Sequence, residues 1–384
     1  MTQALVTDQL VETARRSTGL EQFDAETFRE GLDIFLADFN RQEVPRSGIE
    51  RTGQTIVAAL ATRLKTTEYL KTRPELLERK IERPVFVFGI PRTGTTLLNN
   101  LLAADPNRRS PLSWEIDDPI PPATSATLYT DPRALARLAQ ERAMLAANPD
   151  IGKYYRFSAI YPNECLFFMG HDFKNVNWES RGKLPNYRDY LFGDIDMKPA
   201  YAYHKRFLQI LQAEAPGVWN LKMPSHALYL ETLLETYPDA RLIWAHRDPL
   251  TATGSFCSLI DNGGQMSIGF SDRKWIGDNM PWQAVQHVER IMDFRDKYGE
   301  DRIIDSHYAD LMRDPINAMQ VLYAALGDEF TPEAEAGMKA WLADNPQGKF
   351  GKHNYKLDAY GLTPEALRPR FERYLSRYKV EAEG

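Results

Sequence analysis

One stretch near residue 90 limits the folds open to this chain more than any other. Residues 85–88 form a short continuous apolar run, which is typical of a strand buried on both faces. A turn rich in glycine and threonine follows, and then one apolar face of a helix, formed by Leu97, Leu98, Leu101 and Leu102. In such a strand–loop–helix unit, backbone N–H groups and the helix dipole favour an anion. The sequence therefore predicts a phosphate-binding loop at this point.

The loop nearly matches the triphosphate-binding pattern G-x-x-x-x-G-K-[ST]. Gly89, Gly94 and Thr96 fit the pattern, but Thr95 occupies the position of the lysine that holds the β- and γ-phosphates. The nearby cation is instead Arg92, inside the loop. The loop therefore suits an anion other than a metal-bound triphosphate. Two functions remain open as alternatives to an enzyme that binds such an anion. One is a P-loop nucleotide kinase or hydrolase, and the other is a catalytically inactive nucleotide-binding protein.

The strand–helix unit recurs along the chain. Three further apolar runs lead into prolines at or near helix starts, at residues 218–222, 242–246 and 302–306. Strands that alternate with helices indicate a mainly parallel sheet covered on both faces, whose ligands bind beyond the carboxyl ends of the strands. This pattern places Arg92, Lys222, Arg247 and Tyr308 near one rim of the sheet.

These patterns predict an α/β fold with a P-loop-like central sheet, flanked by helices, in a single domain over residues 1–384. Residues 1–82 form an N-terminal helical layer, 83–330 the α/β core, and 331–384 a C-terminal basic loop and helix. Residues 115–215 interrupt the alternation with prolines and then many aromatic side chains. This insertion is either an acceptor pocket beside the rim or an ordinary aromatic core.

The loop at 89–96, with the sequence GIPRTGTT, resembles the 5′-phosphosulfate loop of sulfotransferases that use 3′-phosphoadenosine 5′-phosphosulfate (PAPS). Its arginine form is similar to that of the tyrosylprotein sulfotransferases and of a broad bacterial group. The resemblance implies in-line transfer of a sulfuryl group from PAPS to a hydroxyl or amine, assisted by a general base. Because arginine and lysine polarise the phosphosulfate, no metal is expected.

The resemblance also implies roles for residues around the transferred group. The 5′-phosphate is held by the backbone N–H groups of Thr93, Gly94, Thr95 and Thr96. The side-chain hydroxyls of Thr95 and Thr96 also bind it. Arg92 reaches the sulfuryl or bridging oxygen, and Lys222 stabilises the leaving phosphate.

Further residues resemble the family's nucleotide-binding positions. Arg247 and Ser255, eight residues apart, correspond to the arginine and serine that bind the 3′-phosphate. Tyr308 corresponds to a tyrosine that contacts adenine, although Ala309 replaces the glutamate of the family pattern. A late basic loop offers Lys349 and Lys352 to the 3′-phosphate, and the sequence leaves open which of them points inward.

The general base is predicted to be Glu115. It follows Trp114, which partly desolvates it, and it lies 23 residues after Arg92, close to where the tyrosylprotein enzymes have a glutamate base. Glu164 and His171, in the aromatic insertion, and His226, on the rim, are the alternatives.

Composition limits the partners. A net charge of −6 argues against nucleic acid, and the acidic pI with the aromatic insertion favours a small or lipid-like acceptor over a polyanionic glycan. Cys165 and Cys257 lie far apart in no metal-ligand pattern, so both are predicted to be core residues. With no targeting segment or membrane-spanning run, a cytoplasmic bacterial enzyme is expected. A homo-oligomer is compatible with the sequence.

Overall fold

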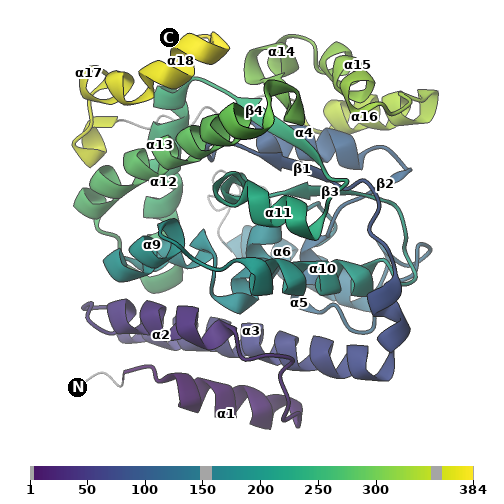
Figure 1. Cartoon of the computed structure of the whole chain (residues 1–384). Helices are drawn as coiled ribbons and strands as arrows, with labels where there is room; N and C mark the ends of the chain where they lie inside the picture. Colours follow the sequence, from purple (N-terminus) through teal and green to yellow (C-terminus); the bar gives the residue numbers. More distant parts are fainter. Residues whose placement is uncertain (1–3, 148–157, 347–356, 384) are drawn as a thin grey trace.

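The computed structural model describes residues 4–147, 158–346 and 357–383 (Figure 1). Within these residues, parallel strands form one five-stranded sheet in the order β2-β3-β1-β4-β5. The strands are β1 (Val85–Phe88), β2 (Arg108–Arg109), β3 (Val218–Lys222), β4 (Arg241–His246) and β5 (Ile303–His307). The α/β fold with a parallel central sheet is therefore confirmed. The two-residue strand β2 has no counterpart in the prediction.

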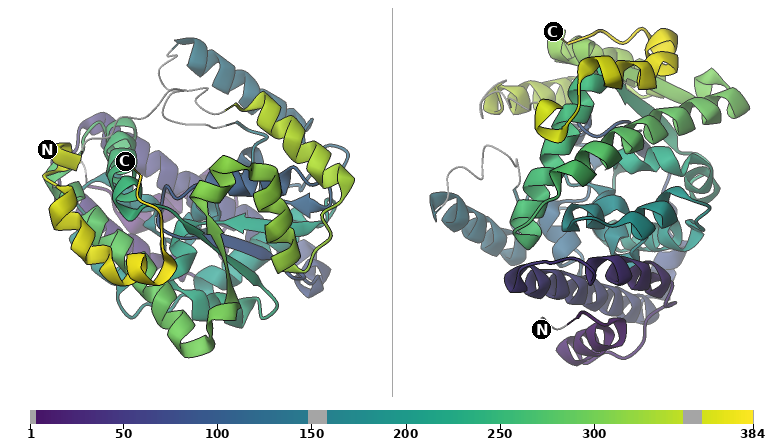
Figure 2. Two further views of the ribbon diagram at one scale, coloured as in Figure 1. Left: turned by 90° about the horizontal axis from the view of Figure 1, so that it is seen from above. Right: turned by 90° about the vertical axis from the view of Figure 1, so that its left-hand side faces the viewer.

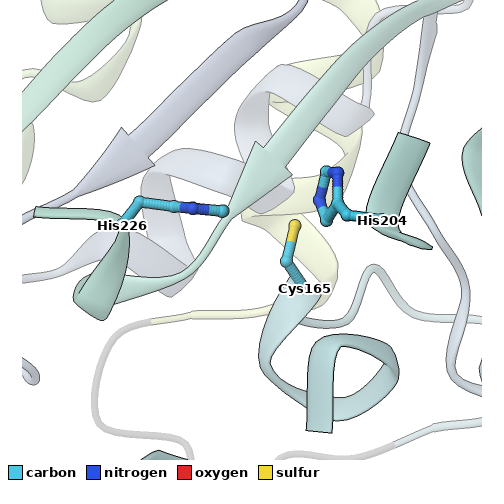
Figure 3. Close-up of side chains that lie close together, drawn as sticks. All are labelled: Cys165, His204 and His226. Atoms are coloured by element: carbon cyan, nitrogen blue, oxygen red, sulfur yellow. The ribbon is translucent and has the colours of Figure 1, made fainter. Parts of the chain in front are cut away.

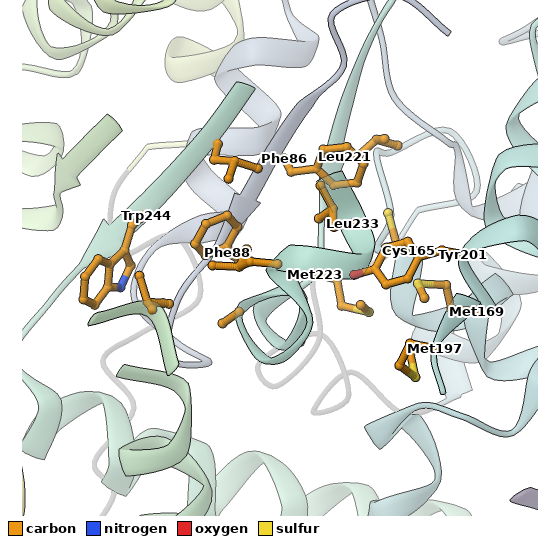
Figure 4. Close-up of a cluster of buried hydrophobic side chains, with 14 of the residues drawn as sticks. Phe86, Phe88, Cys165, Met169, Met197, Tyr201, Leu221, Met223, Leu233 and Trp244 are labelled. Carbon is orange, nitrogen blue, oxygen red and sulfur yellow. The ribbon is translucent and has the colours of Figure 1, made fainter. Parts of the chain in front are cut away.

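The two faces of the sheet are buried by different helices. Along β1, Phe86 and Phe88 belong to the larger hydrophobic cluster, part of which Figure 4 shows, whereas Val85 and Val87 pack on the opposite face. Because successive side chains of a strand point to opposite faces, this continuous apolar run buries both. Helices on the phenylalanine side are α8 (Cys165–Met169), α10 (Lys198–Leu211), α11 (Leu230–Thr236), α13 (Arg273–Tyr298) and α18 (Glu372–Tyr378). Helices on the valine side are α4 (Thr95–Ala103), α14 (Tyr308–Arg313), α15 (Pro315–Leu326) and α16 (Pro332–Asp344).

The N-terminal region is helical, as its periodicity predicts. Helices α1 (Thr7–Thr18), α2 (Phe28–Phe39) and α3 (Arg46–Thr72) form a layer at one end of the molecule, opposite the C-terminal helix (Figures 1 and 2). Their apolar side chains form one hydrophobic cluster with those of α9 (Pro185–Phe192), which α2 contacts directly. Buried Arg63 of α3 donates hydrogen bonds to Asp172 (2.7 Å) and Asp24 (2.9 Å). The layer is thereby tied to the segment that follows α8.

The aromatic-rich insertion contributes mainly to the core. It contains α5 (Ser113–Asp117), α6 (Pro132–Ala147, predicted at 131–147), α8, α9 and α10. Most of its described aromatic side chains are buried, among them Phe168, Phe173, Trp178, Tyr187, Phe192, Tyr201 and Tyr203. Tyr161 and Phe167 are exceptions, with exposed fractions of 37% and 40%. These two rings lie three residues before and three residues after Glu164 in the sequence.

The remaining helices complete the core and the C-terminal region. They are α12 (Pro249–Ile268), which follows β4, and α17 (Pro364–Leu367), which precedes α18. Across the ranges that the structure describes, no helix combines the length and the apolarity needed to cross a bilayer. Cys165 and Cys257 are both free and buried, as predicted.

Candidate functional site

The rim at the carboxyl ends of the strands carries four of the predicted site residues. Lys222 is the last residue of β3, Arg92 lies in the loop after β1, and Arg247 and Tyr308 directly follow β4 and β5. Val87 pairs with both Lys222 and Ile243, and His246 pairs with His307, so β4 and β5 end together, three residues beyond the level of Lys222. A parallel sheet necessarily brings these ends to one edge.

The loop after β1 has the backbone of an anion cradle. Arg92 and Gly94 both adopt left-handed conformations, with φ of 77° and 87°. Gly94 is the N-cap of α4, and no side chain caps that helix. The hydroxyl of Thr93 donates a hydrogen bond to the carbonyl of Ile90 (2.9 Å). Thr93 would therefore contact an anion through its backbone N–H and not through its hydroxyl. A non-glycine residue in this conformation costs about 1–3 kcal/mol, a strain that is common where backbone groups are positioned for a ligand.

Tyr308 packs directly on this loop. A Cβ atom at position 94 would lie 2.5 Å from Cδ2 of the Tyr308 ring, so only glycine fits there. The guanidinium carbon of Arg247 lies 4.2 Å from the centroid of the same ring. Tyr308 therefore joins the phosphate loop to Arg247 through a cation–π contact.

Arg92, Arg247 and Ser255 are brought together, although they come from three segments. The Nε atom of Arg92 donates to the hydroxyl of Ser255 on α12 (3.0 Å). Nη1 of Arg247 donates to the backbone carbonyl of Arg92 (2.9 Å). Two guanidinium groups and a hydroxyl therefore lie beside the loop, an arrangement suited to an anionic ligand.

Arg247 also holds an internal carboxylate that the sequence analysis missed. Its Nε and Nη2 atoms donate to Oε1 and Oε2 of Glu383, at 2.6 and 2.7 Å. The backbone N–H of Glu383 donates to the carboxylate of Asp248 (3.3 Å). The two-pronged contact is the one an arginine makes with a phosphate. No pattern in the sequence links positions 247 and 383, so this contact was not predictable.

Lys222 links the loop to an acidic side chain. Its buried ammonium donates to the hydroxyl of Thr96 (3.4 Å), in the first turn of α4, and forms an ion pair with Glu164. The Glu164 side chain is 24% exposed, whereas that of Lys222 is 5% exposed. A cation, a carboxylate and a helix N-terminus thus share one place on the rim.

Glu115 lies in a different environment. Its carboxylate is buried and accepts a bidentate pair of hydrogen bonds from Arg109, at 2.6 and 2.9 Å. One oxygen also accepts the backbone N–H of Leu112 (3.1 Å), which fixes the start of α5. None of these bonds joins Glu115 to Arg92 or Lys222.

The two alternative histidines are also core residues. His171 is buried and hydrogen-bonded to the Tyr203 hydroxyl (3.0 Å), and burial lowers its pKa to about 3. His226 is fully buried against Tyr201 (2.8 Å), and burial lowers its pKa well below the usual value. Of the acids and histidines named from the sequence, Glu164 alone is shown in contact with Lys222. Lys349 and Lys352 lie outside the described residues.

Comparisons with known proteins identify the family of the chain. Residues 84–332 match the model of a sulfotransferase family, a span that covers the whole sheet. The chain resembles the crystal structure of sulfotransferase STF9 from Mycobacterium avium, with 40% identity, a TM-score of 0.91, and coverage of 100% of this chain and 98% of that one. It also resembles STF1 from Mycobacterium tuberculosis, with 30% identity, a TM-score of 0.85, and coverage of 97% and 100%.

A third similarity is to the omega-hydroxy-beta-dihydromenaquinone-9 sulfotransferase Stf3 of Mycobacterium bovis. It is 25% identical over 297 residues, which are 73% of this chain and 70% of that protein. The match of the family model and the similarity to STF9 along the full chain lead to one conclusion: this protein belongs to the sulfotransferase family.

Proposed function

We propose that this protein transfers a sulfuryl group from PAPS to the hydroxyl, or amine, of a small or lipid-like acceptor. One observation carries the proposal: the Lys222 ammonium contacts both Thr96, at the start of the phosphate-loop helix, and the Glu164 carboxylate. A leaving phosphate held at the helix N-terminus and an acceptor beside Glu164 would therefore lie on two sides of one cation. Sulfuryl transfer requires that order.

Each side chain has a defined task in this proposal. PAPS supplies the activated sulfuryl group on its 5′-phosphate. The N–H groups at 93–96 bind that phosphate, while Lys222 and Arg92 stabilise the charge that develops on the bridging and sulfuryl oxygens. Glu164 accepts the proton of the acceptor hydroxyl as the new S–O bond forms. Arg247 and Ser255 bind the 3′-phosphate, after Glu383 has left Arg247.

We infer that Glu164, rather than Glu115, is the general base. A general base must reach the acceptor proton, and it needs an oxygen atom that is accessible to the acceptor. Both oxygens of Glu115 are committed to Arg109 inside the protein. Glu164 is partly exposed and contacts the lysine proposed to assist transfer. The sequence-based preference for Glu115 is therefore replaced by one of its alternatives.

The surroundings of Glu164 favour an apolar acceptor. Tyr161 and Phe167 expose large aromatic surfaces close to it in the chain. Exposed rings of this kind commonly mark the binding site of an apolar partner. The name of the relative Stf3 describes a hydroxylated menaquinone derivative as its substrate. We propose that this protein likewise sulfates a terminal hydroxyl on an apolar molecule.

Calorimetric titration with 3′-phosphoadenosine 5′-phosphate tests the donor. We expect this bisphosphate to bind at least about tenfold more tightly than 5′-AMP, since a charged hydrogen bond contributes about 1.5–3 kcal/mol. ATP with magnesium is the third ligand. Preference for it over the bisphosphate would overturn the proposal in favour of a nucleotide kinase or hydrolase.

Arg247→Ala and Glu383→Gln are expected to change nucleotide affinity in opposite directions. Loss of the Arg247 guanidinium should raise the Kd for the bisphosphate by about 10- to 100-fold. Removal of the Glu383 charge should lower that Kd by about three- to tenfold, because the nucleotide no longer competes with a carboxylate for Arg247. Glu381→Gln is the matched control, since Glu381 lies 3.6 Å from Arg313 instead. Equal effects of the two glutamine variants would argue against competition at Arg247.

A further inference from the structure

Three potential metal ligands meet in the core beneath the candidate active site. They are Cys165 of α8, His204 of α10 and His226 of the 3₁₀ turn Pro224–Leu228. One ligand atom from each lies within 4.8 Å of those of the other two. Figure 3 shows the sulfur atom of Cys165 pointing between the two imidazole rings. All three side chains are fully buried.

In each histidine of this cluster, one ring nitrogen has a hydrogen-bond partner and the other has none in the described structure. Nδ1 of His204 is hydrogen-bonded to the hydroxyl of Tyr237 (2.6 Å), and Nδ1 of His226 to that of Tyr201 (2.8 Å). The Nε2 atoms of both rings are buried and have no hydrogen-bond partner in the described structure. Each such orphaned polar atom costs about 1–3 kcal/mol, so a pair of them beside a thiol requires an explanation.

We propose that Cys165, His204 and His226 bind a thiophilic d¹⁰ metal ion, zinc(II) or copper(I), through Sγ and the two Nε2 atoms. Thiolate and imidazole are the ligands that these two ions prefer in proteins. The tyrosine hydroxyls then act as second-shell partners, which commonly fix the orientation of metal-bound histidines. Binding forms one metal–sulfur and two metal–nitrogen bonds, releases the thiol proton to solvent, and involves no oxidation or reduction.

The distances are compatible with this site. With metal–ligand bonds of about 2.0–2.3 Å, ligand atoms on one tetrahedral ion lie roughly 3.4–3.6 Å apart. Ligand atoms within 4.8 Å of one another need to close by at most about 1.4 Å, which rotation of side chains can supply. The surroundings are aromatic: the Phe168 ring stacks on His204 with centroids 4.9 Å apart, and the Phe86 ring lies edge-on to His226 at the same distance. A thiolate in this apolar setting offsets the charge of the ion.

The metal would join the segments that carry the proposed catalytic pair. Cys165 directly follows Glu164, and His226 lies four residues after Lys222. An ion bound here would therefore brace the Glu164 and Lys222 segments against α10, below the rim, as a structural element and not as a participant in transfer. The expectation that transfer needs no metal is unaffected. The inference does not depend on the proposed acceptor or donor, because metal binding is measured directly.

Metal analysis of the purified full chain tests the site. Cells are grown with added zinc in one arm and added copper in another, and the protein is desalted under reducing conditions. We expect about one equivalent of one of the two metals per chain in wild-type protein, and less than about 0.1 equivalent in Cys165→Ala. Cys257→Ala removes the other buried thiol and should keep the full equivalent. Removal of the metal should lower the wild-type Tm by roughly 5 °C.

A second variant guards against misfolding of the first. His204→Asn deletes the Nε2 ligand but retains a polar group near the Tyr237 hydroxyl, and it too should lose the metal. Cobalt(II) added to metal-free wild type should give a thiolate-to-cobalt absorption band in the near ultraviolet that is absent from Cys165→Ala. A wild-type protein with neither metal nor cobalt band would overturn the proposal. So would equal metal content in wild type and both variants.

Discussion

Glu164→Gln lowers kcat by about 10²- to 10⁴-fold and leaves the Tm nearly unchanged; this is the result we expect if Glu164 is the general base. Glutamine has the same size but cannot accept the acceptor proton. The loss of charge should cost little stability, because the glutamine amide oxygen can still accept a hydrogen bond from the buried Lys222 ammonium. Single-turnover transfer from PAPS to an alcohol found in an acceptor screen measures the rate, and calorimetric titration with the bisphosphate checks that the donor site is intact.

Glu115→Gln is the matched control, and we expect the opposite result. Its bidentate ion pair with Arg109 is buried, and removal of one partner of such a pair costs about 3–5 kcal/mol. The variant should therefore unfold at a lower temperature, while the molecules that remain folded keep wild-type kcat. Lost turnover with unchanged stability in Glu115→Gln, and retained turnover in Glu164→Gln, would restore the assignment made from the sequence.

Arg92→Ala is expected to reduce kcat by about 10²- to 10³-fold, the second large effect. Its guanidinium is proposed to stabilise charge on the transferred group, and loss of one such donor costs about 3–4 kcal/mol in the transition state. Affinity for the bisphosphate should fall less than kcat, since that ligand lacks the sulfuryl group. Rapid-quench kinetics with saturating PAPS separates the two effects.

Ser255→Ala is the control for Arg92, because the serine hydroxyl accepts the hydrogen bond from Nε of Arg92. If Arg92 acts on the reacting group, Ser255→Ala should mainly raise the Kd for the bisphosphate and lower kcat by less than about tenfold. Undiminished turnover in Arg92→Ala would remove the catalytic role. Equal losses of kcat in the two variants would show that Arg92 acts only through Ser255.

The sheet and its rim were predictable because their signals are local. The run 85–88 and its loop identify β1, and similar apolar runs identify β3, β4 and β5 to within one residue at each end. In a parallel sheet, these boundaries alone bring Arg92, Lys222, Arg247 and Tyr308 to one edge. The edge of the sheet that carries these residues therefore follows from the strand boundaries, without any knowledge of side-chain contacts.

Individual side-chain contacts were not predictable. Glu115 is predicted as the base from its place after Trp114, but its ion pair with Arg109 depends on β2, a two-residue strand without a periodic signal. The same is true of Glu383 on Arg247 and of the three ligands at Cys165, His204 and His226. In each case the pairing depends on how the chain packs, and no spacing in the sequence records it.

The position of Glu164 in the chain has an evolutionary consequence. The proposed donor-binding residues follow β1, β3, β4 and β5, whereas Glu164 and its exposed aromatic neighbours belong to the segment between β2 and β3. Substitutions in that segment can therefore alter the choice of acceptor while the proposed donor-binding residues stay unchanged. Duplicated copies of such a gene could therefore diverge to modify different acceptors and still use the one proposed sulfuryl donor.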